Sequence, residues 1–248
     1  MQMKRQNAAE ENRSLLRKTA TAILPLLLLV FGVCQGASAS TLLVVSADNQ
    51  GRYLNPVNFI DEYGPASGYA GVFLATLNGS TTYPVFCVDL YTDINPGVDY
   101  NVDVYAPNDP SVVDFSSNLP QAAWLYNTYL PQVNAASDSN VYGAALQLAI
   151  WDVVLDGGDG LTSGVFQLDP TVTDPTQIAA YNLAASMITA SQGQSSLNAA
   201  ILMNVAGPSG AQTLITSADA LGETPEPSTL VLIGVGILGV GMLKRRRV

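Results

Sequence analysis

The sequence predicts an α+β fold, in which a mostly antiparallel β-sandwich or barrel-like domain carries a helical insertion. Short segments rich in Val, Tyr, Phe and Thr, each bounded by turn residues, occur at both ends of the central region. Three longer segments with helical spacing of apolar residues lie together between them. An order of strands, then helices, then strands favours a sheet with separate helices over a parallel βαβ arrangement.

The individual elements follow from their boundary residues. The predicted strands span residues 42–46, 71–77, 83–91, 100–105, 199–205 and 211–216, and the predicted helices span 119–130, 141–155 and 176–190. Ser117 or Asn118 is the expected N-cap of the first helix. Ser139 or Asn140 should begin the second helix, and Gly157 should end it.

The first 39 residues have the form of a secretory signal peptide. A basic region precedes an apolar stretch at 20–33, and Ala37 and Ala39 provide the small residues of a cleavage site. Cleavage after Ala39 removes Cys34 and leaves Cys87 as the one cysteine of the mature protein. The domain should therefore occupy residues 40–212 of an exported protein, with signal peptidase as a processing partner.

The C-terminus combines Pro225-Glu226-Pro227, an apolar run at 230–243 and four basic residues at 244–247. This order closely resembles the PEP-CTERM sorting signals of Gram-negative bacteria. The resemblance implies that an exosortase processes the protein, which is anchored in the membrane in transit and then reaches the cell surface or extracellular matrix. We therefore expect a sorting signal with a transmembrane helix at 225–248, joined to the domain by a linker at 213–224.

Charge and residue usage exclude several classes of function. The whole chain has 10 basic and 20 acidic residues and no His. Residues 40–224 contain one base, Arg52, and 17 acids, a formal charge of −16. Phosphate backbones repel such a segment, which excludes nucleic-acid binding. The lack of His excludes Ser-His-Asp and Cys-His catalytic groups and a His metal site.

Neither a metal nor a cofactor is predicted. Acidic residues at 89, 93, 99 and 103, and again at 152, 156 and 159, fit solvated turns better than a calcium site and do not have EF-hand spacing. Residues 234–239 match the dinucleotide motif G-x-G-x-x-G, but the chain ends nine residues later, before any acid that could bind a ribose. Paired carboxylates for glycoside hydrolysis are not evident either.

Two residues stand out in the central region. Cys87 lies in an apolar strand segment, where it could simply be a small buried hydrophobe. Gln147 lies on the helix face formed by positions 143, 144, 147, 150, 151 and 154, whose other members are small or apolar. A buried glutamine amide without partners costs about 1–3 kcal/mol, so Gln147 either bonds to nearby backbone or has reacted.

A cysteine thiolate that attacks a glutamine carboxamide expels ammonia and forms an internal thioester. This bond is an activated acyl group, which an incoming amine can take while a thiol is released. The chemistry needs a Cys and a Gln on rigid elements and aromatic cover against water, but no His, metal or cofactor. Phe86, Tyr91, Tyr142 and Trp151 are candidates for that cover.

These residues resemble a known family, the bacterial thioester-domain adhesins. Its marks are a Phe/Tyr-Cys pair and a later Thr-Gln-x-Ala-Ile-Trp motif, matched here by Phe86-Cys87 and by Gln147, Ala149, Ile150 and Trp151, with Leu146 in the Thr position. Residues 121–127 are similar to the helix that precedes the Gln motif, and the resemblance covers residues 69–158. It implies a Cys87–Gln147 cross-link that binds amine-bearing surface molecules covalently.

Lysine usage agrees with this interpretation, because residues 40–224 contain no lysine that could consume a thioester. The expected function is therefore covalent adhesion or biofilm attachment, once per molecule and without enzymatic turnover. The alternative is a non-covalent structural or polysaccharide-associated matrix protein sorted by exosortase. A secreted hydrolase acting through Asp pairs is a further alternative, and it would not depend on Cys87.

Overall fold

Two antiparallel sheets and three α-helices make up the part of the chain that the structure describes, residues 41–112, 117–205 and 210–223. The structure is a computed structural model, and all of these residues belong to the unit Ser40–Pro225. The helices follow one another between strands β6 and β8, which confirms the predicted α+β organisation with a helical insertion.

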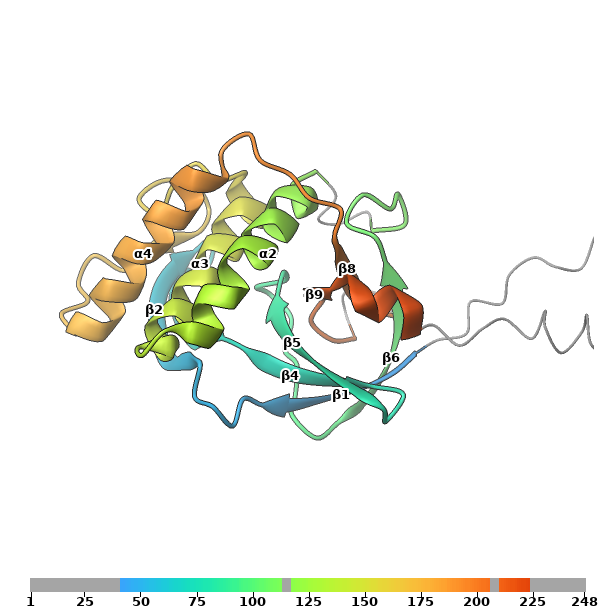
Figure 1. Cartoon of the computed structure of the whole chain (residues 1–248). Helices are drawn as coiled ribbons and strands as arrows, with labels where there is room; N and C mark the ends of the chain where they lie inside the picture. Colours follow the sequence, from blue (N-terminus) through green and yellow to red (C-terminus); the bar gives the residue numbers. More distant parts are fainter. Residues whose placement is uncertain (1–40, 113–116, 206–209, 224–248) are drawn as a thin grey trace, which may run out of the picture. The chain divides into compact units, whose positions relative to one another are not determined.

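The larger sheet is a closed barrel with the strand order β1-β4-β5-β9-β8-β6 (Figure 1). Its strands are β1 Thr41–Ala47, β4 Phe73–Leu77, β5 Thr81–Cys87, β6 Asp99–Tyr105, β8 Ala199–Asn204 and β9 Leu214–Ser217, and every neighbouring pair is antiparallel. Alternate residues of β4 are fully buried, as expected where one face of a strand points into a core. Closure leaves this sheet without an unpaired edge.

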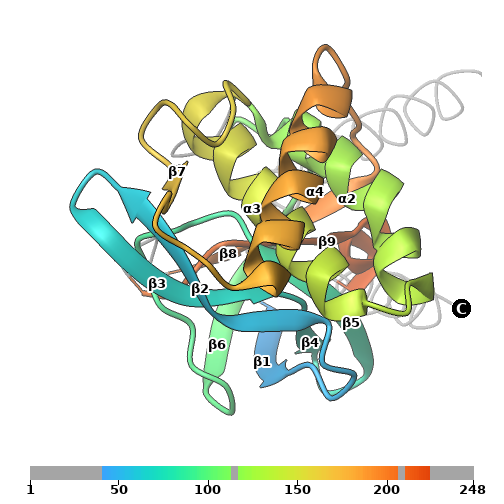
Figure 2. The ribbon, with the colours of Figure 1, turned by 90° about the vertical axis from the view of Figure 1, so that its left-hand side faces the viewer.

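The smaller sheet has three strands in the order β3-β2-β7: β3 Gly64–Gly71, β2 Tyr53–Asp61 and β7 Gln167–Leu168. Figure 2 shows β2 and β3 running beside the helices. The sequence did not predict this sheet. Three glycines in β3 give it little intrinsic strand preference, and the register of β2 shifts between Leu54 and Val57, where Pro56 cannot donate a ladder hydrogen bond.

The three helices are α2 Leu119–Ala135, α3 Ser139–Asp156 and α4 Pro175–Ser191, close to the predicted ranges. α2 continues past the predicted end with Pro131 inside it. Asn118 is its N-cap residue, and α3 begins at Ser139, as predicted, with Asp138 as its N-cap residue. Gly157 ends α3 in the left-handed conformation with φ 71°, as expected for a glycine C-cap.

α3 is the central helix of the unit, packed between α2 and α4 and against β2, β3 and β5 (Figures 1 and 2). Every residue from Gly143 to Val154 is buried. The sequence singled out one apolar face of this helix, and the structure shows the helix covered all round. Such burial is typical of a core helix that is apolar on all sides.

One backbone contact fixes the position of α3 against the loop before β2. An ideal Cβ on Gly143 would lie 2.0 Å from the carbonyl oxygen of Arg52, so only glycine permits this approach. The Arg52 side chain forms a buried ion pair with Asp48 at 3.0 Å and a short hydrogen bond with Asn134 of α2. Burial acts to raise the pKa of Asp48, but hydrogen bonds from Arg52 outweigh it and lower that pKa below its ordinary value.

The end of the unit differs from the linker that the sequence predicted at 213–224. Residues Leu214–Ser217 form β9, which pairs with β5 and β8 and completes the barrel. A 3-10 helix, η1, follows at Ala218–Glu223. β9 corresponds to the strand predicted at 211–216, and the linker predicted from residue 213 overlaps this barrel strand.

The two predicted end segments lie outside the described residues. These are the signal peptide with Ala37 and Ala39, and the sorting tail with Pro225, Glu226, Pro227 and the expected transmembrane helix. Within residues 41–112, 117–205 and 210–223, no helix combines the length and apolar character needed to cross a membrane.

Candidate functional site

Cys87 is the last residue of β5 and is 2% exposed. Strand β5 lies between β4 and β9 in the barrel, and Cys87 is in register with Leu214 of β9. Adjacent residues of a strand point to opposite faces, so Phe86 and Cys87 project to different sides. The position is rigid because ladder hydrogen bonds hold β5 on both edges.

Gln147, from the middle of α3, is the side chain that meets Cys87. Its Oε1 accepts a hydrogen bond from the Cys87 backbone N–H at 2.9 Å, and its Nε2 donates to the Cys87 carbonyl oxygen at 2.7 Å. Gln147 is 1% exposed, so both hydrogen bonds are formed away from water. The structure therefore brings together the two residues that the sequence singled out, 60 positions apart.

A second glutamine, Gln212, contacts the sulfur atom itself. The Cys87 thiol donates to Gln212 Oε1 at 2.8 Å, and Gln212 Nε2 donates to the backbone carbonyl of Asp89 at 2.5 Å. Gln212 lies 125 residues beyond Cys87, in the segment that leads into β9. Sequence reasoning missed it, because no local motif marks this residue and only closure of the barrel places it beside β5.

Electrostatics at the site favour the uncharged state of the cysteine. Burial raises the pKa of the Cys87 thiol far above its ordinary value, and the nearby carboxylate of Asp89 raises it further. Asp89 is 3% exposed; its Oδ1 accepts from the Tyr91 N–H, and its Oδ2 has no hydrogen-bond partner. A thiolate would therefore be costly in this pocket, whereas a neutral acyl-sulfur bond would carry no charge to be desolvated.

Tyr69 is a further aromatic neighbour that sequence reasoning missed. Burial is the main cause of its raised pKa, with smaller effects from Asp48, Tyr53 and Cys87. Its hydroxyl donates to the Val72 carbonyl at 2.6 Å. Its ring stacks between Tyr53 and Phe73, with centroid distances of 4.4 and 4.2 Å.

The predicted aromatic cover is distributed differently from the expectation. Phe86 is fully buried and packs edge-to-face on Tyr126 of α2. Trp151 joins Phe59 and Phe166 in a three-ring cluster with centroid distances of 5.5–5.9 Å. Tyr91 is 43% exposed and contacts Tyr63.

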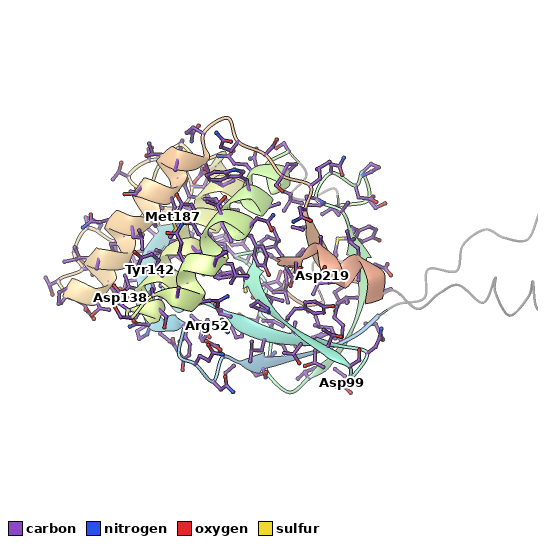
Figure 3. All side chains as sticks on the ribbon, in the orientation of Figure 1. Arg52, Asp99, Asp138, Tyr142, Met187 and Asp219 are labelled. Atoms are coloured by element: carbon purple, nitrogen blue, oxygen red, sulfur yellow. The ribbon has the colours of Figure 1, made fainter. Side chains whose placement is uncertain are left out.

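The other motif residues are part of the core. Ala149 and Ile150 are fully buried within α3, as is Leu146, which occupies the Thr position of the motif. Tyr142 is half-buried, and Figure 3 shows it with Asp138 at the N-terminal end of α3. These residues fix α3 in the core, and through it the position of Gln147.

The acidic groups divide into two sets. Those at 89, 93, 99 and 103 do not form a cluster of possible metal ligands in the described part of the chain, whereas Asp152, Asp156 and Asp159 do. Burial raises the pKa of Asp152 to about 7, and the charges of Asp159 and Asp156 act in the same direction. The Gly160 N–H acts in the opposite direction, although it makes no hydrogen bond of normal geometry with this carboxylate.

Chemically, the site presents a carboxamide, a thiol and a hydrogen-bond donor in one water-poor place. The Cys87 N–H already points at the carboxamide oxygen, where negative charge would develop if a nucleophile attacked the amide carbon. The arrangement suits acyl transfer between Gln147 and Cys87.

Comparison with known proteins supports the predicted tail. Residues 223–247 match the PEP-CTERM protein-sorting motif, which confirms the sorting signal and implies export, passage through a membrane-anchored state and processing by an exosortase. No curated protein matches the chain. Among solved structures, the N-terminal domain of the Streptococcus pyogenes pilus tip adhesin Cpa is similar, with a TM-score of 0.44 and 11% identity over 74% of this chain and 95% of that one.

Proposed function

We propose that this exported protein carries an internal thioester between Cys87 and Gln147 and uses it to attach covalently to an amine-bearing surface or matrix molecule. The observation that supports the proposal most strongly is the double hydrogen bond between the Gln147 carboxamide and the backbone of Cys87. Any suitable donor and acceptor would satisfy the hydrogen-bonding groups of a buried glutamine amide. Here the partner is the one residue in the unit with a nucleophilic thiol.

The proposed bond formation conserves atoms and charge. Cys87 Sγ bonds to the Gln147 side-chain carbonyl carbon, the bond from that carbon to Nε2 breaks, and ammonia leaves with the thiol proton. The Cys87 N–H, 2.9 Å from Oε1, stabilises the oxyanion of the tetrahedral intermediate.

In the attachment step, an amine nitrogen bonds to the same acyl carbon, and the carbon–sulfur bond breaks. The partner is then held through an amide, and Cys87 regains its thiol by taking up the amine proton. Each molecule reacts once, so the protein is not a turnover enzyme. The absence of lysine from residues 40–224 protects the thioester from side chains of the same domain or of neighbouring copies.

In this proposal, the attachment reaction takes place after export. The sorting motif at 223–247 implies passage through the membrane-anchored state, and we place the final protein on the cell surface or in the extracellular matrix. There, amines of proteins or amine-bearing polysaccharides are accessible to it. Adhesion or biofilm attachment is the corresponding role.

Intact mass of the protein purified after export tests the proposal. We expect a mass lower than that of the processed sequence by one ammonia, and a gain of one methylamine after incubation with that amine. Cys87→Ala should show neither change. A wild-type protein with the full sequence mass, no methylamine adduct and a thiol that reacts only after unfolding would contradict the proposal and would favour a non-covalent matrix protein.

Gln212→Ala distinguishes the roles of the two glutamines. Because Gln212 holds the sulfur but Gln147 provides the acyl carbon in this proposal, we expect Gln212→Ala to slow ammonia loss, so that a mixture of two masses follows synthesis. Gln147→Ala should abolish the loss entirely. The reverse pattern would make Gln212 the acyl donor and would refute the assignment to Gln147.

A further inference from the structure

Three carboxylates gather where α3 ends and the following loop begins. Asp152 and Asp156 lie on the last turns of α3, and Asp159 follows the glycine cap. One oxygen from each lies within 4.8 Å of the others. Asp152 is fully buried, Asp156 is half-buried and Asp159 is exposed, so the cluster reaches from the core to the solvent.

Asp152 is the unusual member of this group. Its side chain is 0% exposed, and neither of its carboxylate oxygens has a hydrogen-bond partner within the described part of the chain. By contrast, the buried carboxylate of Asp48 forms an ion pair with Arg52. A buried carboxylate without partners is strongly disfavoured unless a proton or a cation compensates it.

The domain has no basic side chain to provide that compensation. Arg52 is the single basic residue between positions 40 and 224, and it binds Asp48 and Asn134. The two oxygens of Asp156 accept hydrogen bonds from the Val165 and Phe166 N–H groups at 2.9 and 2.8 Å. These donors are neutral, so they do not cancel the negative charge of the cluster. The compensating charge must therefore come from outside the domain.

We propose that Asp152, Asp156 and Asp159 bind one calcium ion. Hard divalent cations take carboxylate oxygens, and Ca²⁺ holds them at about 2.3–2.6 Å, so two ligands on opposite sides of the ion lie about 4.6–5.2 Å apart. The three oxygens lie within 4.8 Å of one another, which agrees with ligands around one such ion. Water reaches the site past Asp159 and completes the coordination shell.

The ion would stabilise the end of α3 against the loop that follows it. Asp156 already holds the backbone of Val165 and Phe166, and the Phe166 ring packs on Trp151 at 5.8 Å. Trp151 follows Gln147 by one helical turn on α3. Calcium would thus order the loop and the aromatic cluster, independently of whether the thioester forms.

Calorimetric titration of the exported protein with CaCl2, after removal of metal with EDTA, tests this inference. We expect one ion per molecule with a Kd on the order of 0.1–1 mM, the range of extracellular calcium modules. The thermal midpoint should rise with calcium and return when EDTA is added. KCl at matched ionic strength should not reproduce the rise.

Two variants and a matched control complete the test. Asp152→Asn should abolish calcium binding, and Asp159→Asn, which changes an exposed side chain and leaves the core intact, should weaken it at least about tenfold. Asp99→Asn removes the same charge from the barrel strand β6, away from the helices (Figure 3), and should bind as wild type. Equal binding by Asp99→Asn and Asp159→Asn, or the absence of stoichiometric binding by wild type, would overturn the proposal.

Discussion

Compared with Cys87→Ser, in which the Gln147 carboxamide stays intact, Gln147→Leu should destabilise the domain by about 2–6 kcal/mol, because it leaves both backbone groups of Cys87 buried without partners. Each unsatisfied buried group costs about 1–3 kcal/mol. Leucine has a similar volume, so little of the loss would come from a cavity. The same substitution removes the acyl donor, and we expect neither ammonia loss nor a methylamine adduct. Urea unfolding followed by tryptophan fluorescence measures the first effect, and intact mass the second.

Cys87→Ser is the matched control for this variant. It also prevents the thioester, but it keeps the backbone hydrogen bonds to Gln147 and places a hydroxyl where the thiol meets Gln212. The difference in unfolding free energy between the two variants therefore reports the hydrogen bonds without the cross-link. Equal stability of Gln147→Leu and Cys87→Ser would show that the carboxamide does not hold Cys87 in the folded protein.

Gly143→Ala is expected to have the second large effect, a loss of about 2–3 kcal/mol. The added Cβ would lie 2.0 Å from the Arg52 carbonyl oxygen and 2.8 Å from its carbon, and both are backbone atoms that cannot rotate away. Overpacking commonly costs about 1–3 kcal/mol and this contact is severe, although alanine regains roughly 1 kcal/mol of helix propensity. The midpoint of thermal unfolding should fall accordingly, by roughly 2–4 °C per kcal/mol.

Gly68→Ala provides the comparison for Gly143→Ala. A Cβ at Gly68 of β3 would meet only Phe59 Cε1 at 3.7 Å, an ordinary van der Waals contact. We expect its thermal midpoint to stay close to that of wild type. If Gly143→Ala were as stable as Gly68→Ala, α3 could shift away from Arg52, and the position of Gln147 would not depend on that contact.

Much of the site could be predicted from sequence because its two principal residues are anomalies in local patterns. Gln147 is a polar residue among apolar helix positions, and Cys87 is a lone thiol in an exported chain. Their partners are not anomalies. Gln212 and Tyr69 are ordinary polar and aromatic residues in segments with no motif, and only the folded chain brings Gln212 to the sulfur and lets Cys87 act on the pKa of Tyr69.

The same distinction explains the errors in the fold. β2 and β3 contain Pro, Asn and several Gly, so their intrinsic preference is weak, and pairing with each other and packing against α3 form the sheet. The strand predicted at 211–216 is present as β9, but the predicted linker began inside it, because the pairing of β9 with β5 and β8 joins segments distant in sequence. The acids at the end of α3 resembled solvated turns, since sequence does not show that Asp152 is buried.

The sequence by itself determined the sorting tail, the charge distribution, the helical insertion and the pair Cys87 and Gln147, because each depends on residues close together or on composition alone. The tertiary structure decided that β9 closes the barrel, that Gln212 contacts the sulfur and that Asp152 is buried without a hydrogen-bond partner among the described residues. These features depend on contacts between segments far apart in the chain. Burial and hydrogen bonding across such distances are properties of the packed core, which local propensity does not encode.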